Sequence, residues 1–232
     1  MHGWKNFVCG GLILLSASVP SLTEASTVTS NTNVYNANSV GCDMIEAGRY
    51  EEAARYFMAA LNQESTFAPA WLGLSVAFAG IKDYDTSIDC AKNAIKFCDG
   101  NEQFKSKAVG NLTASYYERG IAYYDKGEFG KAIKDYSRAI ELAPKFTYAY
   151  NNRGNAHNAK GEYDKAIADY NCALEIDSSY TLPYYNRAVA YKRKSSFEQA
   201  LADCETYLRS EPEDKDAKQL RQEILEAMQK KG

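Results

Sequence analysis

Apolar residues along residues 113–146 recur with the spacing of two helices joined by a tight turn. The second half of this stretch carries an apolar stripe at helical intervals, formed by Phe129, Ala132, Ile133, Tyr136, Ala139 and Ile140. Gly127 and Glu128 precede the stripe and indicate a turn, because glycine adopts backbone angles that other residues resist. Pro144 follows the stripe, and proline does not continue a helix interior. The pattern therefore predicts one helix–turn–helix unit here.

The same pattern returns at a fixed interval along the chain. The short sequence that ends in Arg119-Gly120 returns in similar form, ending at Gly154 and at Ala188. An alanine follows twelve residues after each of these three ends, at Ala132, Ala166 and Ala200. A fixed period of this length, about 34 residues, is typical of stacked supersecondary units. The predicted units are 113–146, 147–180 and 181–214, and the pattern extends backwards to units at 34–67 and 68–101.

Because small and aromatic residues recur in register, the chain resembles the tetratricopeptide repeat (TPR) family. The resemblance implies an all-α fold, a right-handed superhelical solenoid of helix–turn–helix units that ends in a C-terminal capping helix. The unit at 68–101 matches least well, since Ser75 and Ser87 replace the usual small glycine and alanine.

Two segments depart from the period. Residues 102–112 are additional to the repeat pattern, and we expect them to lengthen a first helix, with Asn101 as its N-cap. After residue 214, an amphipathic pattern predicts the capping helix over 215–232, which a solenoid needs to cover its last apolar face. The apolar positions of that helix are Ala217, Leu220, Ile224 and Met228.

The N-terminus has the layout of a secretory signal peptide over residues 1–25, with cleavage after Ala25. Its apolar run, Phe7 to Val19, is short of the roughly 20 residues that span a bilayer. An apolar helix that docks on the array is the alternative. Residues 26–33 read as a polar leader. We therefore expect an exported chain, periplasmic or secreted, with no transmembrane segment in its mature form.

Composition gives little support for an enzyme. The formal net charge is −3, without the basic stripe that phosphate binding requires, so we expect no nucleic acid. No spacing suits zinc, and no phosphate loop or nucleophile elbow is present. Of the two histidines, His157 takes the place of Tyr123 and Tyr191 and is expected to be a packed aromatic substitute. We expect no cofactor, no metal and no small-molecule substrate.

The cysteines form no visible disulfide framework, because five remain, an odd number, once the signal peptide is removed. A second repeated feature is an arginine followed by an aspartate sixteen residues later, at Arg119, Arg153 and Arg187 with Asp135, Asp169 and Asp203. Spacing that follows the repeat favours a ladder of ion pairs between helices, and ligand contact by the arginines is the alternative.

The resemblance places ligand binding on the concave surface lined by the first helix of each unit. The candidate groove residues are Tyr117, Tyr124, Tyr148, Asn151, Asn152, Asn155, Asn158, Tyr185, Asn186, Lys192 and Arg193. Asn152 and Asn186 fill a position that in some relatives forms an asparagine ladder along a bound peptide. Each tyrosine could equally be core. Of the residues that define the chaperone carboxylate-clamp subclass only Asn152 matches, so we do not expect that subclass.

These observations predict a non-catalytic scaffold or adaptor that binds a protein or peptide in its groove. The alternative is a subunit that docks into a larger envelope or membrane-associated complex through its convex face. A large apolar patch on the second helices would favour the docking subunit.

Overall fold

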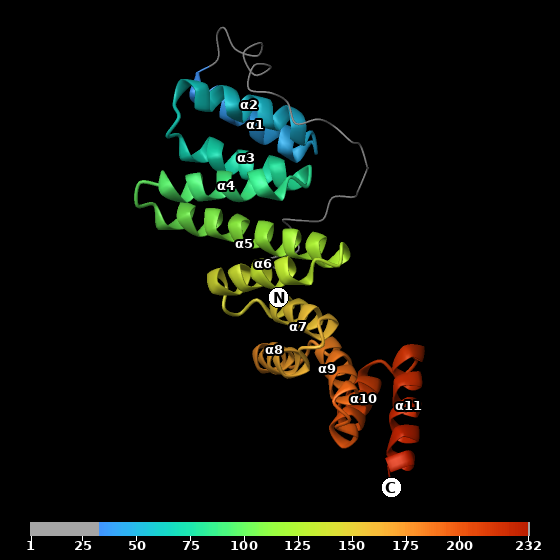
Figure 1. Cartoon of the computed structure of the whole chain (residues 1–232). Coiled ribbons are helices and arrows are strands. Elements are labelled where there is room, and N and C mark those ends of the chain that lie inside the picture. Colours follow the sequence, from blue (N-terminus) through green and yellow to red (C-terminus); the bar gives the residue numbers. More distant parts are fainter. Residues whose placement is uncertain (1–32, 232) are drawn as a thin grey trace. The chain divides into compact units, whose positions relative to one another are not determined.

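The computed structural model describes residues 33–231, and this part of the chain folds into eleven helices without a strand (Figure 1). The predicted signal peptide and residues 26–32 of the predicted leader lie outside the described residues. The helices are α1 (Val34–Glu46), α2 (Tyr50–Gln63), α3 (Ala68–Gly80), α4 (Tyr84–Lys96), α5 (Glu102–Asp125), α6 (Phe129–Leu142), α7 (Thr147–Ala159), α8 (Tyr163–Ile176), α9 (Leu182–Arg193), α10 (Phe197–Ser210) and α11 (Lys215–Lys231). The chain divides between Ser115 and Tyr116, inside α5, into two compact units.

In the first unit, helices that follow one another in the chain pack together, α1 on α2, α2 on α3 and α3 on α4. The fully buried ring of Phe57, from α2, lies against two glycines, Gly41 of α1 and Gly73 of α3. A Cβ at Gly41 would lie 2.7 Å from a ring atom of Phe57, and one at Gly73 would lie 2.3 Å from it. Three helices therefore meet around one aromatic ring, because two of them carry no side chain at the contact.

The serines that weaken the repeat pattern form a buried hydroxyl cluster in the same unit. The Ser87 hydroxyl in α4 donates a hydrogen bond to the carbonyl oxygen of Ser75 in α3, at 2.7 Å. The Ser87 Oγ also lies 2.7 Å from the Ser115 Oγ in α5. Serine is small enough for the close helix contacts that glycine and alanine make elsewhere, and the hydroxyls satisfy one another.

In the second unit the small–aromatic contact is formed by residues that recur in register in the sequence. A Cβ at Gly120 would come within 2.7 Å of the Tyr136 ring, and one at Gly154 within 2.6 Å of the Tyr170 ring. Both tyrosine rings are buried between helices. Tyrosine in the second helix therefore fills the space that glycine leaves in the first.

The additional segment 102–112 is helical, because α5 runs unbroken for 24 residues. The Asn101 side chain caps its start by accepting a hydrogen bond from the backbone N–H of Phe104, at 3.0 Å. Both the lengthened helix and its cap follow the prediction from sequence.

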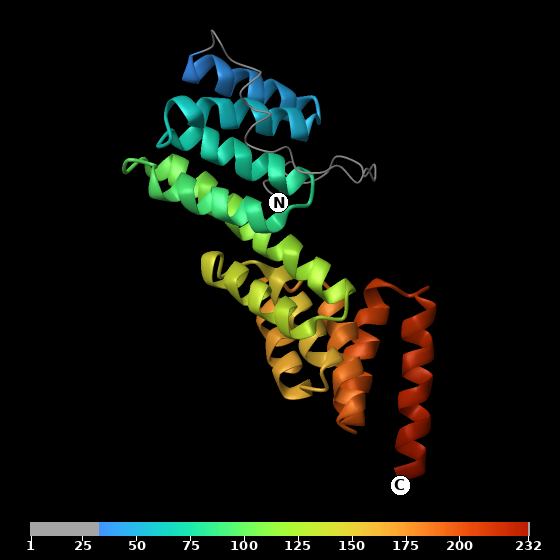
Figure 2. The same cartoon turned by 45° about the horizontal axis from the view of Figure 1, so that its top comes forward.

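Helix α11 packs beside α10 (Figures 1 and 2). It begins at Lys215, one full repeat period after the predicted start of the fifth unit at residue 181. Ala217, Leu220 and Ile224 are buried, and the Asp214 carboxylate caps the helix through the N–H of Ala217, at 2.9 Å. The helix thus takes the place that the first helix of a sixth unit would occupy.

None of the helices built by residues 33–231 has both the length and the apolar character needed to cross a membrane.

Candidate protein-binding groove

The first helices of the second unit are linked by a chain of side-chain hydrogen bonds. The Asn186 amide of α9 donates to the Asn151 Oδ1 of α7, at 2.9 Å. Asn151 donates in turn to the Oδ1 of Asn152, at 3.3 Å, and Asn152 donates to the phenol oxygen of Tyr117 in α5, at 2.9 Å. The three amides all donate in the same direction, from α9 towards α5. We call Tyr117, Asn151, Asn152 and Asn186 the amide chain.

The amide chain changes the role expected for Asn151. Its side chain is only 1% exposed, so Asn151 holds neighbouring helices in register and cannot contact a ligand directly. Asn152 and Asn186 are half-buried, and each donates only one of its two amide hydrogens within the amide chain. The sequence assigned all three asparagines the same role as candidate groove residues, because the burial of one side chain does not follow from the repeat pattern.

Two further candidate asparagines lie on the same helix, α7. Asn155 accepts a hydrogen bond from the buried Tyr170 phenol at 2.8 Å, which ties α7 to α8. The side-chain Oδ1 of Asn158 is buried and has no hydrogen-bond partner within the described part of the chain. Tyr124 packs edge-on against Phe129, with ring centroids 5.3 Å apart.

A row of aromatic rings follows the loops that lead into α7 and α9. Tyr117 lies 4.7 Å from Phe146, Phe146 lies 6.4 Å from Tyr148, and Tyr148 lies 4.9 Å from Tyr180, measured between ring centroids. Burial raises the pKa of Tyr180 to about 12, and burial also raises the pKa of Tyr117. Tyr117 and Tyr180 are therefore neutral hydrogen-bonding groups at physiological pH.

The large apolar side chains that remain exposed share one repeat position. Within residues 33–231 they are Tyr35, Tyr148 and Leu182, which are 68%, 52% and 39% exposed. Each is the second residue of its predicted unit, on or at the start of a first helix. In the described part of the chain no second helix carries such a residue.

A cavity of about 270 Å³ lies between α9 and α11. Four of the residues that line it belong to α9, namely Tyr185, Val189, Lys192 and Arg193, and four to α11, namely Asp216, Gln219, Leu220 and Glu223. The Lys192 ammonium forms an ion pair with the Glu223 carboxylate, which also accepts from the Gln219 amide at 2.9 Å. Three candidate groove residues therefore meet here, and Lys192 is already engaged.

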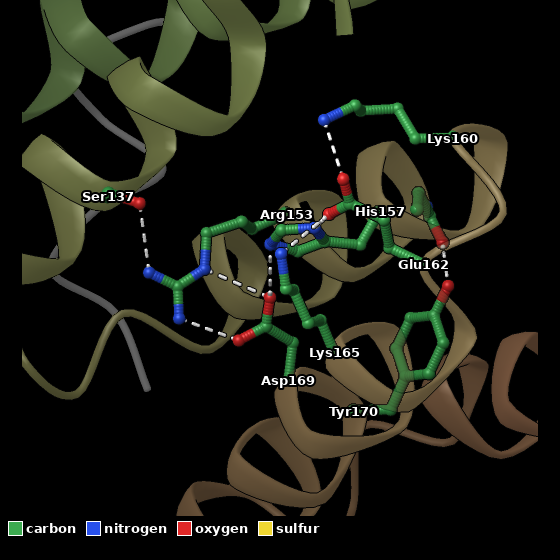
Figure 3. A network of polar contacts seen from close by, with 9 residues as sticks. Ser137, Arg153, His157, Lys160, Glu162, Lys165, Asp169 and Tyr170 are labelled. Atoms are coloured by element: carbon green, nitrogen blue, oxygen red, sulfur yellow. Dashed lines mark hydrogen bonds and ion pairs between the residues drawn. The ribbon is translucent and has the colours of Figure 1, made fainter. Parts of the chain in front are cut away.

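The predicted ladder of arginine–aspartate ion pairs is present in the three repeats 113–146, 147–180 and 181–214. Arg119, Arg153 and Arg187 each bind both carboxylate oxygens of their aspartate, and the aspartates are 5–7% exposed. Arg153 also donates to the Ser137 hydroxyl of the preceding unit at 3.0 Å (Figure 3). Arg187 likewise donates to Asn171. Arg153 and Arg187 thus each join two successive units, so the structure assigns these arginines to the scaffold.

His157 is mostly enclosed, with 11% of its side chain exposed, as expected for a packed aromatic substitute. It also bonds to a carboxylate, which was not expected from the sequence. Its Nδ1 lies 2.6 Å from the Glu162 Oε2 (Figure 3). Lys160 and Lys165 also bond to Glu162, at 2.7 and 3.2 Å. Lys160, His157 and Lys165 together hold the pKa of Glu162 at about 2.

The five cysteines that the structure describes are free thiols. Cys42 is exposed, and partial burial with the nearby carboxylates of Asp43 and Glu46 raises its pKa. Cys90 and Cys204 are buried. Within the described residues, no group of three or more His, Cys, Asp or Glu side chains could hold a metal ion.

Comparison with known proteins agrees with the repeat pattern. A TPR repeat model matches residues 120–161, and two tetratricopeptide repeat models match residues 147–180 and 41–102. The anaphase-promoting complex subunit CDC16 of Saccharomyces cerevisiae is 27% identical over 127 residues, which are 45% of this chain and 15% of that protein. The chain therefore spans only a small part of the length of this relative.

Solved structures show the same fold. YrrB, described as a TPR protein with an unusual peptide-binding site, has a TM-score of 0.59 at 18% identity, covering 88% of this chain and 100% of its own. The MamA protein gives 0.58 at 22% identity, over 77% of this chain and 92% of its own. The first TPR domain of human RPAP3 gives 0.50 at 27% identity, over 51% and 94%. With its helix pairs, its small–aromatic contacts and its matching family models, the chain belongs to the tetratricopeptide repeat family.

Proposed function

We propose that this chain is a non-catalytic scaffold or adaptor that binds an extended protein segment along the first helices of its second unit. The observation that carries the proposal is the position of the exposed apolar side chains. Tyr148 and Leu182 occupy equivalent positions on neighbouring first helices, and no second helix in the described chain exposes a comparable residue. Aromatic and aliphatic side chains held in the open are typical of contact surfaces in protein recognition.

The amide chain supplies the polar half of such a surface. An extended peptide presents alternating N–H and C=O groups, and an amide can donate to one and accept from the other. Asn152 and Asn186 are fixed by their hydrogen bonds to Tyr117 and Asn151, so little side-chain entropy is lost when a ligand binds. Apolar anchors at one end and fixed amides beside them suit a protein segment better than a small molecule.

A docking subunit that uses its second helices is the alternative. The name of the CDC16 relative, a subunit of a complex, fits either role, and this chain covers only 15% of that protein. The scarcity of exposed apolar side chains on the described second helices favours the adaptor.

Affinity capture from extract of the source organism separates the two. The full chain is compared with Tyr148→Ala/Leu182→Ala, whose side chains are exposed enough for truncation to leave folding intact. We expect the variant to lose a captured protein, with a dissociation constant at least about tenfold weaker. The control is Glu198→Ala/Gln199→Ala on α10, which alters an exposed second-helix surface. Equal capture by the first-helix variant and loss in the control would favour docking through the second helices.

We further propose that the chain is exported, with Ser26 as its mature N-terminus. The support is the sequence of residues 1–25, which lie outside the described structure. Mass spectrometry of the protein purified from its native source checks this. A peptide that begins at Ser26 is the expected result, and an intact N-terminus from Met1 would overturn it.

A further inference from the structure

Helix α11 continues the repeat register as well as covering the last apolar face. Counting in steps of one repeat period, Asp216 corresponds to Leu182 and Tyr148, and Gln219 corresponds to Tyr185. Leu220 likewise corresponds to Asn186 in α9. Asp216, Gln219 and Leu220 all line the cavity between α9 and α11. The surface formed by the first helices therefore extends by one helix beyond the fifth unit.

The lining of this cavity holds two cations and two carboxylates, and only one cation is bonded to a carboxylate. Lys192 and Arg193 stand side by side in the last turn of α9, and one carboxylate, Glu223, faces them from α11. Lys192 is paired with Glu223, whereas Arg193 is exposed and makes no ion pair or hydrogen bond with any described residue. The other acid in the lining, Asp216, lies seven residues before Glu223, about 10 Å along the helix at 1.5 Å per residue. Arg193 therefore acts on Glu223 only through its charge, and its guanidinium hydrogens stay free to bond another carboxylate.

The size of the cavity limits what it can hold. At about 270 Å³ it falls just below the roughly 300–1,000 Å³ of sites that enclose whole small molecules. It has room for one or two side chains from a longer ligand. Its apolar lining, Val189 and Leu220, suits the aliphatic part of such a side chain.

We propose that the cavity between α9 and α11 binds an acidic side chain of the partner, with Lys192 and Arg193 as its cationic contacts. This inference rests on the proposed function, because the acidic residue belongs to the same extended segment that binds the first helices. The guanidinium of Arg193 can bind a carboxylate through two parallel hydrogen bonds. Glu223 shows that a carboxylate fits beside Lys192, and it occupies that place until the partner binds.

Displacement of Glu223 is feasible because the pair is partly solvated. The side chains of Lys192 and Glu223 are 29% and 42% exposed, and ion pairs in contact with water contribute little to stability. Glu223 can turn towards solvent without leaving a buried charge. An arriving carboxylate then has both cations available, and Glu223 weakens its binding by competition.

The test uses a positional-scanning library of nine-residue peptides and the full chain. At each position the library compares Glu with its neutral isostere Gln, and the readout is the enrichment of captured peptides. We expect a preference for Glu of about tenfold at one position, a size typical of a charge-assisted hydrogen bond. Raising the salt concentration should reduce that preference, since the contact is accessible to solvent.

Three variants assign the preference to the cavity. Arg193→Ala should abolish it while peptides are still captured, and Glu223→Gln should increase it. Arg209→Ala removes an exposed arginine from α10, outside the cavity, and should leave the preference unchanged.

The outcomes distinguish the two proposals. Capture of peptides that depends on Tyr148 and Leu182 but shows no preference for Glu would overturn the acidic subsite and leave the adaptor function standing. A preference for Glu that survives in Arg193→Ala would also overturn the subsite. If no peptide is captured, the proposed binding surface fails and the subsite fails with it.

Discussion

Arg153 and Arg187 each bond to side chains of two other helices through a single guanidinium group. Arg153 binds Asp169 within its own unit and Ser137 in the unit before it (Figure 3). Arg187 repeats the arrangement with Asp203 and Asn171. A side chain with five fixed donors can serve two helices at once, which a lysine in the same place could not.

Replacement of Asp169 by alanine should therefore be costly. It leaves the Arg153 guanidinium, whose side chain is 22% exposed, without its carboxylate, and should lower the free energy of unfolding by about 2–3 kcal/mol. The comparison is Glu141→Ala, which breaks the exposed pair with Arg138 and should cost less than about 0.5 kcal/mol. Urea unfolding followed by circular dichroism measures both. Equal effects would contradict a structural role for the ladder.

Two helix glycines offer a matched test of the small–aromatic contact. Gly154→Ala places a Cβ within 2.6 Å of the Tyr170 ring, and we expect a loss of about 1–3 kcal/mol from overpacking. Gly110→Ala, in α5, meets no atom within 4 Å and should raise stability by about 0.5–1 kcal/mol through helix propensity. Thermal unfolding midpoints that move in opposite directions are the expected result. A stabilised Gly154→Ala would mean that Tyr170 moves aside at no cost.

Glu162 gives a prediction for acid stability. Its pKa lies at about 2, below the ordinary 4.5, so its ionised form stabilises the folded chain above about pH 4.5. That contribution is lost as the pH falls from 4.5 through 2. The stability difference between the parent and Glu162→Gln should therefore shrink over this window. Urea midpoints at pH 6 and pH 3 measure it, with Glu175→Gln of α8 as a control for net charge. A difference independent of pH would contradict the prediction.

For individual residues, the sequence predicted the contacts that recur from repeat to repeat. It missed the burial or bonding of residues that differ between repeats. Gly120 with Tyr136 and the arginine–aspartate pairs follow from spacing alone, because each unit places them alike. The burial of Asn151 did not follow, since the two adjacent units carry Tyr117 and Tyr185 at that position. The bond between His157 and Glu162 could have been suspected, because a histidine five residues before a glutamate spans the turn between two helices.

Helix α11 contacts α10 and, to a smaller extent, α9. It packs chiefly on α10, where its backbone covers Cys204, and the Cys204 thiol donates to the Ala217 carbonyl oxygen at 3.3 Å. The sequence predicted this helix from its apolar positions. It did not reveal the cavity beside α9, because a cavity depends on the distance between two helices and not on the pattern of either one.

Removal of α11 should uncover Cys204. In the full chain this thiol is buried and burial raises its pKa, so alkylation by iodoacetamide should be slow. In a chain that ends at Asp214 we expect the rate at Cys204 to rise at least about tenfold, because local protection is lost. Mass spectrometry resolves each cysteine, and buried Cys90 of the first unit serves as the internal control. If truncation unfolds α10, the milder Ile224→Ala should still raise the rate. An unchanged rate in both would contradict the role given to α11.

Over the whole molecule, the repeat period is regular on each side of residues 102–112, while the packing falls into two compact units that divide inside α5. In repeat proteins each unit contacts only its neighbours, so stability is close to a sum of local terms. Substitutions at Tyr148 or Leu182 should thus alter binding without changing the first unit. The sequence predicted the period but not the division, because repeats on either side of Ser115 follow the same pattern.

The acidic surroundings of Cys42 bear on the proposed export of this chain. Disulfide exchange requires a thiolate, and its rate falls when the surroundings keep the sulfur protonated. Partial burial and the carboxylates of Asp43 and Glu46 raise the pKa of Cys42, so this exposed thiol is also a slow one to react. In an oxidising compartment, the carboxylates of Asp43 and Glu46 would therefore slow unwanted cross-linking at Cys42, where burial alone is incomplete.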